Sequence, residues 1–291
     1  MIIDKHHNKK LVLKIITVFT ILITISTISY GGYTYISAQQ NIQKAKQAEI
    51  TRIIAVKAAA AAKEAKKKEP VYITLPGSKP IRALVDDYSL PNSIWAVVSK
   101  SHPISADYIP SSLKIPNVST RTDKSNDERS IRSDIETPMI DMFTAAAANS
   151  YQLMIGSGYR SAALQKIYFD SLASSVGEET ANQSIARPGQ SEHQTGLAAD
   201  ITTVSRECYL DDCFADTSDG QWLVNNSYKF GFILRYPKGK EDITGYRYES
   251  WHFRYVGIDL ATALHDSGLT LDEAWPYLNT ALTTLKNNGA I

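Results

Sequence analysis

The segment Ser191-Glu-His-Gln-Thr-Gly-Leu-Ala-Ala-Asp200 decides our interpretation of the fold, because it places two potential metal ligands around a turn and a run of small residues. Its second half is apolar and strand-like. A second strand-like stretch, Trp251–Val256, lies farther along the chain. If these two strands pair, His252 lies near Asp200 and completes a triangle with His193. We therefore expect a small sheet that carries a three-ligand site.

The rest of the sequence mixes strand-length apolar stretches with amphipathic helical stretches in no regular alternation. The expected strands are Gln152–Ile155, Leu197–Thr203, Phe230–Tyr236 and Trp251–Val256. The expected helices are Thr137–Asn149, Ser161 to about Ser175, Thr217–Tyr228 and Leu271–Asn287. Because no βαβ rhythm is present, the predicted fold class is α+β, with a small, mainly antiparallel sheet and flanking helices.

Capping residues and periodicity predict how these helices begin and which side they bury. Thr137 is expected to cap the first helix, with Pro138 at its first position. Thr270 and Glu273 have the spacing of a capping box before the last helix. The second helix is expected to turn four side chains inward: Leu164, Ile167, Tyr168 and Leu172.

Two further charged residues fit a catalytic role around the expected ligands. A catalytic zinc ion takes three protein ligands and leaves a fourth position open, and His193, Asp200 and His252 can supply these three. Glu249 lies three residues before His252 and suits a general base that activates water. Arg160, after a glycine-rich turn, suits stabilisation of an oxyanion or binding of a substrate carboxylate. Taken singly, each of these residues is more often structural, so the prediction depends on their combination.

The sequence resembles the VanY-like D-alanyl-D-alanine carboxypeptidases among the LAS zinc metallopeptidases, over roughly residues 92–258. The patterns Ser-x-His-x-x-Gly-x-Ala-x-Asp and Glu-x-Trp-His are complete at 191–200 and 249–252. Ser-Gly-Tyr-Arg-Ser at 157–161 and Asp-Tyr-Ile-Pro at 107–110 are also similar to the family. The resemblance implies that one zinc ion is bound by His193, Asp200 and His252, that Glu249 is the catalytic base and that Arg160 contacts the substrate or the transition state. It further implies substrate contacts from Ser191, Tyr159 and Gln165.

The function that this resemblance implies is removal of the C-terminal D-alanine from peptidoglycan stem peptides outside the cell membrane. Two alternatives stay open: an LD-carboxypeptidase or endopeptidase of the same fold, and a non-catalytic zinc-containing domain that binds the cell wall. Nucleic-acid binding is disfavoured, because residues 71–291 carry a net charge of −7. Residues 1–70 carry a net charge of +8.

The N-terminal part reads as a membrane anchor. Residues 15–36 carry no charge and are long enough, as a helix, to cross the hydrocarbon core of a bilayer. Four lysines precede them, which predicts a cytoplasmic N-terminus at residues 1–14 and a single-pass topology with the rest of the chain exported. A signal peptide cleaved near Ala38 is the alternative, disfavoured because its apolar core is usually shorter.

Residues 37–70 are rich in alanine and lysine and are predicted to form a helical stalk between the anchor and an extracytoplasmic domain at 71–291. The isoleucines of the stalk do not repeat as heptads, so a solvated stalk is favoured over a dimer seam. The sequence supports no prediction of the oligomeric state.

Cys208 and Cys213 are the only cysteines of the chain. In an exported protein they are expected to form a disulfide that pins a local loop. Reduced thiols or a metal-binding pair are the alternatives, and the second is disfavoured because no further ligand pair lies nearby in the sequence.

Overall fold

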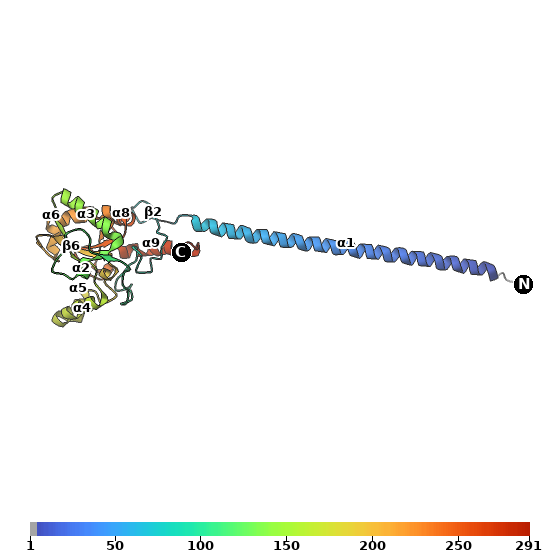
Figure 1. The fold of residues 1–291 in the computed structure, drawn as a ribbon, viewed down its shortest axis with the longest axis horizontal. Coiled ribbons are helices and arrows are strands. Elements are labelled where there is room, and N and C mark those ends of the chain that lie inside the picture. Colours follow the sequence, from blue (N-terminus) through green and yellow to red (C-terminus); the bar gives the residue numbers. More distant parts are fainter. Residues whose placement is uncertain (1–4) are drawn as a thin grey trace. The chain divides into compact units, whose positions relative to one another are not determined.

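The computed structural model describes residues 5–291, and the first four residues of the predicted cytoplasmic segment lie outside the described residues (Figure 1). A single α-helix, α1 (Lys5–Lys68), runs through the segments predicted as anchor and stalk. The stretch Leu13–Lys67 is long and apolar enough to cross a membrane, and none of its most apolar window is buried within the protein. This helix therefore has the properties of a membrane anchor or a signal sequence.

A second compact unit comprises Lys67–Ile291. Its main sheet has four strands in the order β5-β6-β8-β7, and every neighbouring pair is antiparallel. The strands are β5 (Leu153–Ser157), β6 (Ala198–Thr203), β7 (Phe232–Leu234) and β8 (His252–Tyr255). All four predicted strands are present, and the predicted α+β class with a small antiparallel sheet is confirmed.

Two short ladders lie in the proline-rich part of the chain that precedes the sheet. β1 (Tyr72–Ile73) pairs with β2 (Ile81–Arg82), and β3 (Leu113–Lys114) pairs with β4 (Ile131–Arg132). Proline lacks the N–H that a ladder needs, which is why these pairings stay two residues long in a region with frequent prolines.

Helices flank the main sheet, with α3, α6 and α8 toward one side of β6 and α4 and α5 toward the other in the view of Figure 1. They are α2 (Asn126–Arg129), α3 (Glu136–Ala148), α4 (Ala162–Val176), α5 (Glu178–Ser184), α6 (Ser218–Asn226), α7 (Glu241–Thr244), α8 (Ile258–Ser267) and α9 (Leu271–Asn287). The capping box of Thr270 and Glu273 begins α9 as predicted. Helices α2, α5, α7 and α8 were not predicted.

Two details of the helix predictions were wrong. A 3₁₀ turn at Ser133–Ile135 leads directly into α3, so Ile135 occupies the cap position and Thr137 lies in the first turn. In α4 the buried side chains are Gln165 and Phe169, whereas Ile167 is 63% exposed. Residues two positions apart on a helix point to nearly opposite sides, so a helix that buries Gln165 must expose Ile167.

The two faces of the sheet carry different kinds of side chain. Side chains alternate between faces along each strand, so Ala199, Ile201 and Phe253 join the apolar core with α3, while Asp200 and His252 project from the other face. A shift of one residue in register would exchange the faces and bury the polar pair in the core. The apolar pattern of these strands thus also determines where the polar side chains lie.

Candidate metal centre and substrate cleft

Asp200 and His252 are neighbours because of strand pairing. They lie directly opposite each other in the β6–β8 ladder, and His252 Nδ1 is 3.4 Å from Asp200 Oδ1. Both side chains are nearly buried, at 4% and 3% exposed. The strand pairing expected from the sequence is present, and it brings together the second and third predicted ligands.

His193 reaches the same point from a 3₁₀ turn, Glu192–Thr195, that ends at Gly196 in a left-handed conformation. Its Nδ1 lies 2.6 Å from the carbonyl oxygen of Gly158, so Nδ1 carries the proton and Nε2 faces Asp200 at 3.4 Å. Gly158 itself packs tightly against the backbone of Ser130, because a Cβ at position 158 would lie 2.2 Å from the Ser130 carbonyl oxygen, so only glycine fits there. The orientation of His193 is thus fixed by backbone packing.

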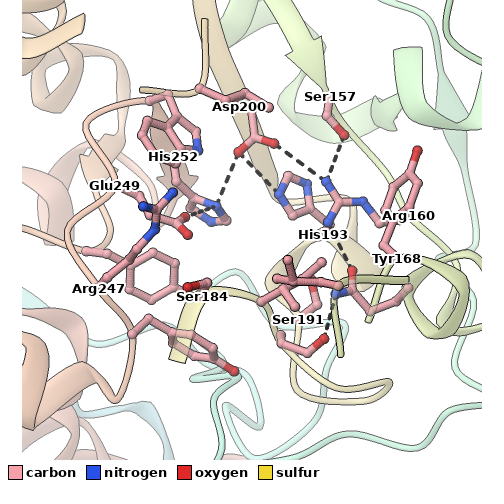
Figure 2. Close-up of a pocket in the computed structure, with 18 of the residues that line it drawn as sticks. Ser157, Arg160, Tyr168, Ser184, Ser191, His193, Asp200, Arg247, Glu249 and His252 are labelled. Carbon is pink, nitrogen blue, oxygen red and sulfur yellow. Dashed lines mark hydrogen bonds and ion pairs between the residues drawn. The ribbon is translucent and has the colours of Figure 1, made fainter. Parts of the chain in front are cut away.

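The three side chains fit a zinc ion. One ligand atom from each lies within 4.8 Å of the other two, and Figure 2 shows Asp200 between the two imidazoles. Ligands about 2.1 Å from a tetrahedral zinc are roughly 3.4 Å apart, which matches the two imidazole-to-carboxylate distances. Two neutral imidazoles and one carboxylate are also the ligand types of catalytic rather than structural zinc sites.

The electrostatics of the site favour a cation between these groups. Although burial works against the charged form, contacts with His193 and His252 hold the pKa of Asp200 well below its usual range. Burial likewise opposes a charged imidazole, yet Asp200 and Glu192 raise the pKa of His252 to about 9. Surroundings that attract a proton this strongly also attract a metal ion in its place.

Glu249 lies beside the metal-facing nitrogen of His252, with its Oε2 3.5 Å from Nδ1 (Figure 2). The two residues belong to one turn, in which the His252 N–H donates to the Glu249 carbonyl. Burial raises the pKa of the Glu249 carboxyl to about 7. A carboxyl group with such a pKa near neutral pH is suited to accepting and returning a proton.

Arg160 lies on the opposite side of Asp200 from Glu249 (Figure 2). Its Nη1 donates to Gln165 and its Nη2 to Ser157, both at 3.0 Å, and Nη2 lies 3.6 Å from Asp200 Oδ2. These contacts hold the planar guanidinium group at the edge of the metal centre, where it can bind a substrate oxygen.

His193, Asp200 and His252 are among the residues that line a cleft of about 390 Å³. Ser191 and Gln165, two of the predicted substrate contacts, line this cleft, whereas Tyr159 is 3% exposed and does not line it. Further lining residues were not predicted; they include Tyr168, Ser184, Tyr209, Tyr236, Tyr246, Arg247 and Trp251. They come from distant segments without a shared motif, apart from Trp251, which lies within the Glu-x-Trp-His pattern.

Cys208 and Cys213 are joined by a disulfide in the loop that follows β6. This loop supplies Tyr209 and Leu210 to the cleft. The cross-link therefore belongs to the wall of the cleft and does not connect distant parts of the fold.

Comparisons with known proteins agree with this geometry. The family model of VanY, described as D-alanyl-D-alanine carboxypeptidase, matches residues 128–258. YodJ of Bacillus subtilis (strain 168), which carries the name of a carboxypeptidase, is 46% identical over 183 residues, which are 63% of this chain and 67% of YodJ.

Two solved structures are similar to the compact unit. The LD-carboxypeptidase LdcB is 45% identical, with a TM-score of 0.61 over 64% of this chain and 87% of LdcB. A glutamate-to-alanine variant of the vancomycin-resistance D,D-pentapeptidase VanY, in complex with Zn(II), is 33% identical, with a TM-score of 0.52 over 64% of this chain and 98% of that chain. With a family match that includes His193, Asp200, Glu249 and His252, and relatives at these identities, the chain belongs to the VanY D-alanyl-D-alanine carboxypeptidase family of zinc-dependent peptidases.

Proposed function

We propose that this protein removes the C-terminal D-alanine from peptidoglycan stem peptides by cleaving a D-alanyl-D-alanine bond. The proposal rests mainly on the finding that His193, Asp200 and His252 lie together beside Glu249 in one cleft. Membership in a family of D-alanyl-D-alanine carboxypeptidases and a structure of VanYB in complex with D-alanine-D-alanine support this substrate class.

In the proposed mechanism His193 Nε2, His252 Nδ1 and a carboxylate oxygen of Asp200 would hold the zinc ion. Zinc in such a site supplies Lewis acidity, which activates water and polarises a carbonyl group. Glu249 accepts a proton from the attacking water and returns it to the amine of the departing D-alanine. Its position next to His252 Nδ1, among the residues that line the cleft, suits both transfers.

Arg160, Gln165 and Ser191 are proposed to bind the substrate. An exopeptidase must recognise a free terminal carboxylate, and a guanidinium group can hold one with two parallel hydrogen bonds. Arg160 is oriented for this by Gln165 and Ser157. Because Arg160 also lies near Asp200, it can alternatively stabilise the negative charge that develops on the carbonyl oxygen.

A specific observation favours a second candidate, cleavage of an LD bond. The LdcB LD-carboxypeptidase has a higher identity and a higher TM-score than the VanY structure, at 45% and 0.61 against 33% and 0.52. Both candidates release D-alanine and use the same chemistry. They differ in whether the residue on the carbonyl side of the cleaved bond has the D or the L configuration. The side chains that line the cleft must distinguish these two configurations.

Incubation of the purified protein with defined stem peptides distinguishes these candidates. We expect pentapeptides to be shortened to tetrapeptides, as measured by mass spectrometry of the products. Shortening of tetrapeptides to tripeptides instead establishes the LD candidate. Conversion of cross-linked dimers to monomers establishes an endopeptidase, and absence of any cleavage by zinc-loaded protein contradicts an enzymatic function.

We also propose that residues 15–36 of α1 span the cell membrane, with residues 1–14 cytoplasmic, residues 37–70 acting as a stalk and residues 71–291 forming the exported catalytic domain. The support is an apolar helix long enough to cross the bilayer, with basic residues before it.

We expect the protein to stay with the membrane fraction after alkaline carbonate washing and to be digested from the outside by protease added to intact protoplasts. A variant that lacks residues 1–36 should be soluble. An N-terminus near residue 39 in the mature protein, found by intact-mass measurement, contradicts an anchor and establishes a cleaved signal peptide.

A further inference from the structure

Glu192 is a buried charge that the proposed mechanism does not use. It precedes His193 in the same 3₁₀ turn and is 0% exposed. Its Oε1 accepts hydrogen bonds from Arg235 Nε at 2.8 Å and from Arg254 Nη1 at 2.7 Å, and both arginines are also 0% exposed. These two ion pairs compensate the charge of the buried carboxylate. Glu192 is therefore a carboxylate that faces the interior.

The second oxygen of this carboxylate is directed at a proposed metal ligand. Glu192 Oε2 lies 3.5 Å from His252 Nε2. Within residues 5–291 neither atom has a regular hydrogen-bond partner, and both are buried. Buried polar atoms are nearly always paired, so each of these atoms is the obvious partner for the other. A small rotation of the imidazole would turn this contact into a hydrogen bond.

The two histidines face the metal centre through different nitrogens. His193 uses Nε2, because its Nδ1 donates to the Gly158 carbonyl. His252 presents Nδ1 to Asp200, which leaves Nε2 as the nitrogen that must carry the proton. Neutral imidazole in solution carries its proton on either nitrogen, so an acceptor at Nε2 is needed to fix the tautomer.

We propose that Glu192 is a positioning residue, which holds His252 with Nε2 protonated and Nδ1 directed at the metal. This inference rests on the proposed ligand set. An isolated buried carboxylate would be strongly destabilising, and Arg235 and Arg254 compensate its charge so that it stays ionised beside the imidazole. The result is a carboxylate–histidine–metal arrangement, which orients the ligand and increases its basicity.

The same network offers a matched control. Arg235 also pairs with Asp272 in α9, through Nη1 at 2.5 Å and Nη2 at 3.3 Å. Replacing Asp272 by asparagine removes a carboxylate from the network but leaves the contact between Glu192 and His252 in place. A purely structural role for the network predicts similar effects of Glu192→Gln and Asp272→Asn on zinc binding, in proportion to their effects on stability.

The test measures zinc affinity by competition with a chelating dye, together with thermal unfolding of the zinc-free proteins. We expect Glu192→Gln to weaken zinc binding by roughly 10- to 100-fold, and Asp272→Asn to change it less than about twofold. Excess zinc should restore most of the turnover of Glu192→Gln. Equal zinc affinity in Glu192→Gln and the wild type overturns the inference, as does an equal loss in both variants.

A measurement on the unaltered protein covers the case in which Glu192→Gln does not fold. In ¹⁵N NMR spectra of zinc-loaded, ¹⁵N-histidine-labelled protein, we expect the proton of His252 on Nε2 and that of His193 on Nδ1. Metal at Nε2 of His252 overturns the inference. If the wild type binds no zinc at all, it is the proposed ligand set that fails, so the two failures are distinguishable.

Discussion

Replacement of Glu249 by glutamine is expected to lower kcat/KM for D-alanine release by about 10²- to 10⁴-fold, the usual contribution of a general base. The amide keeps the shape of the side chain but cannot accept a proton from water. Glu249 lies beside the ligand set, 3.5 Å from His252 Nδ1, and three other residues can hold the metal. Zinc content should therefore stay near one ion per chain, as measured by atomic emission.

Glu207→Gln provides the control for Glu249→Gln. Glu207 is an exposed carboxylate in the disulfide loop and is not among the residues that line the cleft. Its replacement is expected to leave turnover within about twofold of the wild type, as for most exposed substitutions away from a site. Near-normal turnover in Glu249→Gln would rule out Glu249 as the base, whereas loss of zinc in this variant would instead indicate a ligand.

Replacement of His252 by alanine is expected to remove both zinc and activity. The change takes away one of three ligands, leaves Glu192 without its imidazole neighbour and leaves Asp200 with His193 alone. The loss of zinc affinity should exceed the roughly 10- to 100-fold effect of removing an outer hydrogen-bond partner. Turnover should fall to background at zinc concentrations that saturate the wild type.

His265→Ala is the matched control for His252→Ala. His265 lies in α8 as an exposed imidazole stacked on Tyr228, away from the cleft-lining residues. This variant should bind zinc and release D-alanine like the wild type. Circular dichroism distinguishes loss of a ligand from loss of the fold in His252→Ala. A folded His252→Ala protein with full zinc content would exclude His252 as a ligand.

The adjacency of Asp200 and His252 could be predicted because it depends on local pattern. Each residue lies in a strand-like stretch, and pairing of these stretches places them opposite each other. A short turn before β6 is enough to bring His193 close to Asp200. Secondary-structure periodicity and ligand chemistry together therefore sufficed to predict that these three residues meet.

Glu192 could not be recognised in the same way. A glutamate next to a ligand reads as a solvated charge, since glutamate is rarely buried without partners. Its partners, Arg235 and Arg254, lie on β7 and β8 or at their ends, and only the order β6-β8-β7 brings them to one carboxylate. The tyrosines of the cleft were missed for the same reason, because tertiary packing and not sequence spacing places them.

For the anchor and the stalk, the sequence suggested a structural boundary that the structure does not contain. The sequence changes abruptly in composition between residues 15–36 and 37–70, which suggests two elements, yet α1 is continuous through both. Alanine and lysine are strong helix formers, and no proline precedes Pro70, so nothing ends the helix between the two segments. Composition predicted the different surroundings of the two segments but could not define a structural boundary.

The most direct test of the account measures zinc content and D-alanine release side by side in the wild type, Glu249→Gln and His252→Ala, using the full chain in detergent. We expect zinc with release in the wild type, zinc without release in Glu249→Gln, and neither in His252→Ala. Chelation should stop release by the wild type and added zinc should restore it. Release of D-alanine that persists in fully zinc-free protein would contradict the account.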